Sequence, residues 1–218
     1  MSLWIKICGN TSLADAQLAA DAGADAVGFV FAPSPRRVTA ELVATIVPHL
    51  SKKLEKIGVF VDAGLDEIGS TVEAAGLTGV QLHFDAPLEL PAQLRIQFGR
   101  NLRILRVVHF DAAIQALPDD PEIDALMVDS RTAGAVGGTG TTFDWNLAAA
   151  TFFRNAPALD RGIVVAGGLT PENVAEAIAT LHPWGVDVVS GVESAPGRKD
   201  PAKVRAFIAN ALAAADRR

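Results

Sequence analysis

The only cysteine of the chain, Cys8, ends the apolar segment Ile5-Lys6-Ile7-Cys8, just before a helical pattern. A cysteine thiolate can act as a nucleophile or as a base, and such reactivity is one reason to keep a single cysteine at this position. A free cysteine is also among the residues most often buried as a small apolar side chain. The position of Cys8 leaves both interpretations open.

Asp129 ends a second apolar segment, 125–129, and His83 follows Gln81-Leu82 at the end of a third. A thiol and a carboxylic acid that meet in one site can move protons at two positions of a substrate, as an isomerisation requires. Cys8 and Asp129 are therefore the best acid/base pair. Asp129 could instead cap the loop after it, and His83 could be a base or be hydrogen-bonded to the backbone.

Several segments are suited to binding anionic groups. Gly137-Gly138-Thr139-Gly140, Gly167-Gly168 and Ser190-Gly191 each follow an apolar segment. Glycine lets backbone N–H groups approach a phosphate closely, although turns need glycine in any case. Pro35-Arg36-Arg37 supplies guanidinium groups that could bind a carboxylate through two hydrogen bonds, although surface arginines are often simply solvated.

Strand-length apolar segments alternate with amphipathic helical segments along the whole chain, which is typical of βα units. The expected strands are 3–8, 25–31, 56–61, 79–83, 102–108, 125–129, 162–166 and 186–190. The expected helices are 12–22, 39–50, 65–75, 87–98, 111–117, 144–153, 171–181 and 201–214. Thr11, Thr39 and Thr170-Pro171 are predicted helix starts, and Gly23 and Gly76 are predicted helix ends.

Eight units of roughly 27 residues predict an α/β fold, a (βα)8 TIM barrel, as one domain over residues 1–218. The nearest rival is an open doubly wound sheet, but the equal units and the lack of a dinucleotide fingerprint favour the closed barrel. Alternate residues of a barrel strand point inward, and the active site lies at the carboxyl ends of the strands. This register places Cys8, His83, Asp129 and Asp187 at one mouth, with Leu126 and Val128 facing the helices.

The composition limits the function classes. The net charge of −6 gives no basic surface for nucleic acid or for an anionic membrane. One cysteine excludes an internal disulfide and fits a reducing cytoplasm, and no signal peptide or bilayer-spanning segment is evident. The four histidines (His49, His83, His109 and His182) lack ligand spacing, so we expect no metal, and no P-loop or GxSxG motif occurs.

Taken in order, these segments resemble phosphoribosylanthranilate isomerase of tryptophan biosynthesis. The matching stretches include Lys6-Ile7-Cys8-Gly9-Asn10-Thr11, Ser34-Pro35-Arg36, Gln81-Leu82-His83, Asp129-Ser130, Gly137-Gly138-Thr139-Gly140, Gly167-Gly168-Leu169, Ser190-Gly191-Val192-Glu193 and Pro196-Gly197. The resemblance implies an Amadori rearrangement of N-(5-phosphoribosyl)anthranilate to 1-(o-carboxyphenylamino)-1-deoxyribulose 5-phosphate. It implies that Asp129 protonates the furanose ring oxygen and that Cys8 then removes the C2′ proton.

The same resemblance implies that Arg36 holds the anthranilate carboxylate. It places Gly168, Ser190 and Gly191 at the phosphate, with Gly138 as a further candidate in the preceding glycine-rich segment. The chain departs from the family pattern at Phe84, where a glycine is usual, and at Val189, where a serine is usual. The expected partner is this small-molecule substrate, with no cofactor, in a monomer or homodimer.

Two alternatives remain. The first is a related isomerase of the histidine pathway, or one that serves both pathways. Such an enzyme shares the fold and the rearrangement, but its pattern has an aspartate where this chain has Cys8. A non-catalytic barrel that binds a sugar phosphate would not need Cys8, Arg36 and Asp129 together.

Overall fold

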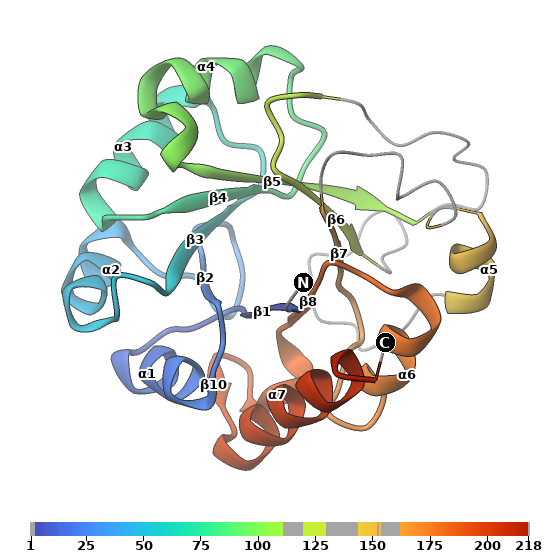
Figure 1. The fold of residues 1–218 in the computed structure, drawn as a ribbon. Coiled ribbons are helices and arrows are strands. Elements are labelled where there is room, and N and C mark those ends of the chain that lie inside the picture. Colours follow the sequence, from blue (N-terminus) through green and yellow to red (C-terminus); the bar gives the residue numbers. More distant parts are fainter. Residues whose placement is uncertain (1–2, 111–119, 130–143, 152, 154–161, 218) are drawn as a thin grey trace.

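The computed structural model describes residues 3–110, 120–129, 144–151, 153 and 162–217. Eight parallel strands follow one another in sequence order around a closed barrel, and the last strand pairs with the first (Figure 1). The strands are β1 Trp4–Ile7, β2 Ala26–Val30, β3 Glu55–Phe60, β4 Gly79–Leu82, β5 Arg103–His109, β6 Ala125–Asp129, β7 Gly162–Val165 and β8 Gly185–Val188. The predicted (βα)8 barrel is thus confirmed, and the open sheet is excluded.

Helices surround the barrel on its outside (Figure 1). They are α1 Leu13–Ala22, α2 Ala40–Ile46, α3 Leu65–Ala75, α4 Glu89–Phe98, α5 Trp145–Ala150, α6 Val174–Leu181 and α7 Pro201–Ala215. The expected helix 111–117 lies outside the described residues. The expected helix 144–153 is shorter than predicted, because α5 ends at Ala150 and Thr151 is its C-cap. Within the described ranges, no helix combines the length and the apolar character needed to cross a bilayer.

The predicted helix ends at Gly23 and Gly76 are confirmed. Their φ angles of 101° and 65° lie in the left-handed region that favours glycine. Thr39 caps α2 as predicted, since its side chain accepts from the Leu42 N–H. Thr11 does not cap α1. Its hydroxyl donates to the Gly197 carbonyl oxygen at 2.6 Å, and the neighbouring Ser12 is the cap.

The predicted start of the expected helix 171–181 at Thr170-Pro171 is also wrong, because this helix, α6, begins only at Val174. The Asn173 side chain accepts from the Thr170 N–H at 2.8 Å and donates to the Gly168 carbonyl oxygen at 3.0 Å. These bonds hold residues 168–173 as a turn. The eighth strand ends at Val188, and Ser190 begins a short 3-10 helix, Ser190–Val192, instead of continuing the strand.

The strands separate two apolar layers. The apolar side chains inside the barrel are Trp4, Ala26, Ile57, Leu105, Val107, Ala125, Met127, Val164 and Ala166. Leu126 and Val128 belong instead to the larger layer between strands and helices, which confirms the predicted register of β6. The rings of Trp4 and Trp184 stack with centroids 5.2 Å apart, and Gly162 and Gly185 leave room for these two rings.

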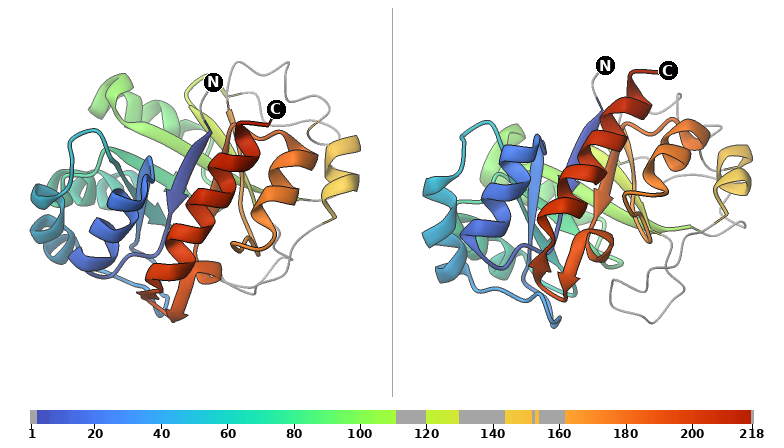
Figure 2. Two further views of the ribbon diagram at one scale, coloured as in Figure 1. Left: turned by 60° about the horizontal axis from the view of Figure 1, so that its bottom comes forward. Right: turned by 90° about the horizontal axis from the view of Figure 1, so that it is seen from below.

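An antiparallel hairpin after β8 was not predicted from the sequence. It consists of β9 Glu193–Ala195 and β10 Arg198–Lys199, joined by Pro196-Gly197. Gly197 has φ of 78°, and proline followed by such a glycine is the pattern of a type II turn. Figure 2 shows the hairpin at the end of the barrel opposite the start of β1 and the end of α7. It therefore lies at the carboxyl ends of the strands, beside the predicted site.

Candidate active site

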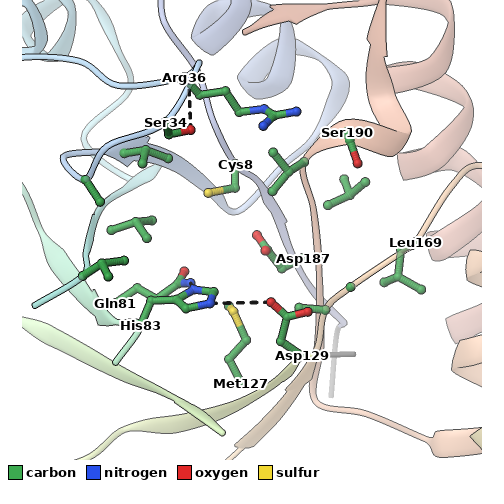
Figure 3. Close-up of a pocket in the computed structure, with 18 of the residues that line it drawn as sticks. Cys8, Ser34, Arg36, Gln81, His83, Met127, Asp129, Leu169, Asp187 and Ser190 are labelled. Atoms are coloured by element: carbon green, nitrogen blue, oxygen red, sulfur yellow. Dashed lines mark hydrogen bonds and ion pairs between the residues drawn. The ribbon is translucent and has the colours of Figure 1, made fainter. Parts of the chain in front are cut away.

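A pocket open to solvent lies at the carboxyl ends of the strands, and the empty space in it, which includes open solvent, is about 820 Å³. Its polar lining comes from five segments of the chain and consists of Cys8, Ser34, Arg36, Gln81, His83, Asp129, Asp187 and Ser190 (Figure 3). Apart from glycines, every site residue expected from the sequence therefore lines one pocket. Gly168 also lines it, whereas Gly191 does not, and Gly138 lies outside the described residues.

Cys8 directly follows β1 and is 3% exposed, yet its side chain lines the pocket. The lack of a side chain at Gly28 makes room for it, since a Cβ there would overlap the Cys8 sulfur. Burial raises the pKa of the Cys8 thiol, while the nearby Lys6 ammonium acts in the opposite direction and favours the thiolate. Cys8 is thus both buried and accessible to a molecule in the pocket.

Lys6 lies inside the barrel, two residues before Cys8, and is fully buried. Its Nζ donates to Asp187 Oδ1 at 2.7 Å and to Gln81 Oε1 at 2.9 Å. Burial lowers the pKa of Lys6, but the attraction of Asp187 and Cys8 outweighs it and raises the pKa above the ordinary lysine value. Lys6 is therefore an ammonium, and Asp187 is its counterion at the base of the pocket.

Asp129 ends β6 and is 8% exposed. Figure 3 shows it on the side of the pocket opposite Cys8, with its carboxylate toward His83. The His83 Nε2 atom is 3.7 Å from Asp129 Oδ2, and His83 Nδ1 is 3.2 Å from Gln81 Nε2. The His83 ring thus contacts side chains of the site, and the His83 main-chain N–H donates to the Phe60 carbonyl oxygen at 2.9 Å.

Arg36 is positioned by a turn after β2, in which the Arg36 N–H donates to Ser34 Oγ at 3.1 Å. It is not a solvated surface arginine, since only 8% of it is exposed. Arg36 Nε and Nη2 donate to the two carboxylate oxygens of Glu193 at 2.8 and 2.6 Å. Glu193 thus occupies one edge of the guanidinium, and the edge formed by Nη1 and Nη2 remains available to a second anion.

The hairpin carries two charged residues that the sequence analysis did not single out, Glu193 and Lys199. Lys199 Nζ donates to the Cys8 carbonyl oxygen at 2.5 Å and to Glu193 Oε1 at 3.3 Å. Burial raises the pKa of Glu193, but Arg36 and Lys199 outweigh it and hold the pKa below the usual value. Burial lowers the pKa of Lys199. Charged residues beside a Pro-Gly turn were the available sequence signal for this cluster.

The two glycine-containing loops after β7 and β8 lie against each other. Gly167 and Gly168 have φ angles of 83° and 65°. A Cβ at Gly191 would overlap the Leu169 carbonyl oxygen, so the close approach of these loops requires glycine there. Gly168 and Ser190 line the pocket, whereas Gly191, the next residue after Ser190, does not.

Of the two departures from the family pattern, Phe84 packs against the core between barrel and helices and is absent from the pocket lining. Val189 does line the pocket and makes that part of it apolar. In the described part of the chain, no three His, Cys, Asp or Glu side chains are grouped so that they could hold a metal ion.

Comparisons with known proteins agree on one family. The family model of N-(5'-phosphoribosyl)anthranilate (PRA) isomerase matches residues 5–210. The N-(5'-phosphoribosyl)anthranilate isomerase of Pelobacter propionicus is 44% identical over 205 residues, which cover 94% of this chain and 93% of that protein. The enzyme of the same name from Magnetococcus marinus is 44% identical over 217 residues, covering 99% and 98%.

Solved structures give the same result. The phosphoribosyl anthranilate isomerase of Thermus thermophilus has a TM-score of 0.81 at 35% identity, covering 95% of this chain and 98% of that one. A phosphoribosyl anthranilate isomerase in complex with reduced 1-(o-carboxyphenylamino)-1-deoxyribulose 5-phosphate has a TM-score of 0.78 at 32% identity, covering 96% and 98%. On this sequence match, barrel and pocket, the chain belongs to the N-(5'-phosphoribosyl)anthranilate isomerase family.

Proposed function

We propose that this pocket rearranges N-(5-phosphoribosyl)anthranilate to 1-(o-carboxyphenylamino)-1-deoxyribulose 5-phosphate, with Asp129 as the acid and Cys8 as the base. Membership of the family makes the protein an isomerase of tryptophan biosynthesis. The observation that carries the residue roles is that Cys8 and Asp129 lie on opposite sides of one pocket (Figure 3). A substrate between them can receive a proton from one and lose a proton to the other.

In the first step, Asp129 gives its proton to the furanose ring oxygen. The C1′–O bond breaks, and the anthranilate nitrogen supplies the electron pair that forms a protonated Schiff base. The Cys8 thiolate then takes the C2′ proton, and the electrons of that C–H bond form the enolamine, which tautomerises to the ketone. Lys6 supports this step because its ammonium stabilises the thiolate against the effect of burial.

The anthranilate carboxylate would bind to Arg36. Glu193 already holds the guanidinium through one edge, so the free edge has a fixed direction before substrate arrives. Fixing a charged donor in advance reduces the loss of side-chain entropy on binding. The neighbouring Arg37 is exposed and does not line the pocket, so it is not a second candidate for this role.

The phosphate would bind at Gly168, Ser190 and Gly191. The left-handed conformation of Gly168 exposes backbone that a side chain would otherwise cover, and the Ser190 hydroxyl is a further donor. Loops after the seventh and eighth strands are the usual phosphate site of this fold. Gly138 stays a prediction from the sequence, as do the cytoplasmic location, the monomer or homodimer and the single domain.

Turnover by the purified protein tests the proposal. Fluorescence of the anthranilate group should change as freshly made substrate is converted, and Cys8→Ala and Asp129→Asn should each slow the change by about 10²–10⁴. The control is the substrate of the related histidine-pathway isomerase, which we expect not to be converted. Equal turnover of both substrates would favour the dual-pathway alternative, and binding without turnover would favour the non-catalytic barrel.

A further inference from the structure

A line of polar side chains crosses the barrel beneath the pocket and ends at Asp129. Asp187 accepts from Lys6 Nζ at 2.7 Å, and Gln81 Oε1 accepts from the same nitrogen at 2.9 Å. Gln81 Nε2 is 3.2 Å from His83 Nδ1, and His83 Nε2 is 3.7 Å from Asp129 Oδ2. Four strand ends, those of β8, β1, β4 and β6, contribute to this line.

Lys6 determines which way the Gln81 amide faces. An ammonium group donates hydrogen bonds and cannot accept them, so the Gln81 atom 2.9 Å from Lys6 Nζ must be the carbonyl oxygen. Lys6 keeps its proton because Asp187 and Cys8 outweigh the effect of burial on its pKa. The amide nitrogen of Gln81 must therefore face His83.

The direction of the Gln81 amide in turn determines where His83 carries its proton. The amide nitrogen only donates, so His83 Nδ1 has to accept from it and carries no hydrogen. A neutral imidazole then bears its proton on Nε2, the atom that faces Asp129. The other titratable ring beside it is His109, with centroids 6.0 Å apart.

We propose that the hydrogen bonds of Lys6 and Gln81 keep His83 as the Nε2–H tautomer. His83 is then a positioning residue for the general acid and not a base. The Nε2–H group points at Asp129 and stabilises the carboxylate that forms as Asp129 gives up its proton. This stabilisation grows along the proton transfer, so it lowers the barrier and not only the energy of the bound state. The positioning role of His83 rests on the proposed function of Asp129 as the acid, whereas the Nε2–H tautomer of His83 is independent of that function.

The tautomer can be read directly by NMR. Two-bond ¹H–¹⁵N correlation spectra of the wild-type protein at neutral pH should show a protonated Nε2 and an unprotonated Nδ1 for His83, with the signal assigned by its loss in His83→Gln. Gln81→Glu replaces the donor facing Nδ1 by an acceptor and keeps an oxygen for Lys6. In that variant the proton should appear on Nδ1. A wild-type spectrum with the proton on Nδ1 would overturn the proposal without need of any variant.

Kinetics tests the catalytic consequence. Gln81→Glu should lower kcat roughly 10–100-fold with KM within about threefold, since the lost interaction acts on the developing charge. Gln93→Glu, the same change on the exposed face of α4, is the matched control and should leave both constants unchanged. His83→Gln offers Asp129 an amide donor and should retain more kcat than His83→Leu.

If Gln81→Glu moves the His83 proton to Nδ1 but keeps kcat within twofold of the wild type, the positioning role of His83 is refuted. Failure of the proposed function looks different. If Asp129→Asn kept near wild-type turnover, Asp129 would not be the acid, while the His83 spectrum would still show the Nε2–H tautomer.

Discussion

The variant Arg36→Lys tests whether one edge of the Arg36 guanidinium holds Glu193 while the other edge binds the substrate carboxylate. A lysine keeps the positive charge beside Glu193 but has a single ammonium, which cannot form two parallel bonds to Glu193 and also present a fixed pair of donors to a substrate. The change should remove one or two charge-assisted hydrogen bonds, each worth about 1.5–3 kcal/mol. Loss of one such bond corresponds to a KM increase of roughly 10–150-fold, because 1.4 kcal/mol is about a factor of ten.

Because the carboxylate is bound in the ground state and in the transition state alike, kcat should change little. The assay is steady-state turnover followed by anthranilate fluorescence, with substrate varied over two orders of magnitude around KM. Arg37→Lys is the matched control, since Arg37 is exposed and adjacent to Arg36 in the chain. Unchanged KM with reduced kcat in Arg36→Lys would show that Arg36 does not bind the anthranilate end.

Four further changes have defined outcomes. Cys8→Ala should lower kcat by about 10²–10⁴ with KM within a few-fold, and near wild-type kcat would mean that Cys8 is only packed. Lys6→Met should raise the Cys8 pKa further, so that alkylation by iodoacetamide requires higher pH; an unchanged pH profile would contradict the ion-pair contribution. Glu193→Gln should cost about 3–5 kcal/mol at pH 7 in urea unfolding. Since the folded pKa of Glu193 lies below its unfolded value of about 4.3, this gap should close as pH falls below that value, and a constant gap would refute the assignment. Gly191→Ala should raise KM, because its Cβ must push the loop away from Leu169, and an unchanged KM would separate Gly191 from phosphate binding.

The residues at the ends of the strands could be predicted from the sequence because their placement follows from local rules. A strand alternates its side chains, so Leu126 and Val128 facing outward fixes Met127 and Asp129 as inward residues. The carboxyl ends of parallel strands in a barrel meet at one mouth, which brings Cys8 and Asp129 into a common pocket.

Helix starts were less predictable, since the competing partners are not local in every case. Thr11 has the side chain of a cap, but its hydroxyl bonds to Gly197, 186 residues away. At Thr170 the competitor is local: the Asn173 side chain holds a turn, and α6 begins three residues later than the Pro171 pattern indicates.

The sequence by itself determined the barrel, the register of β6 and the meeting of Cys8 and Asp129 in one pocket, because local periodicity and the ends of the strands specify each of them. The tertiary structure alone decided which charges meet. Lys6 pairs with residues 75 and 181 positions away, and Arg36 with Glu193 157 positions away. No local pattern encodes such pairs. They form because closing the barrel puts β8 beside β1, and because a buried charge is stable only where the fold supplies an opposite charge or a hydrogen-bond acceptor.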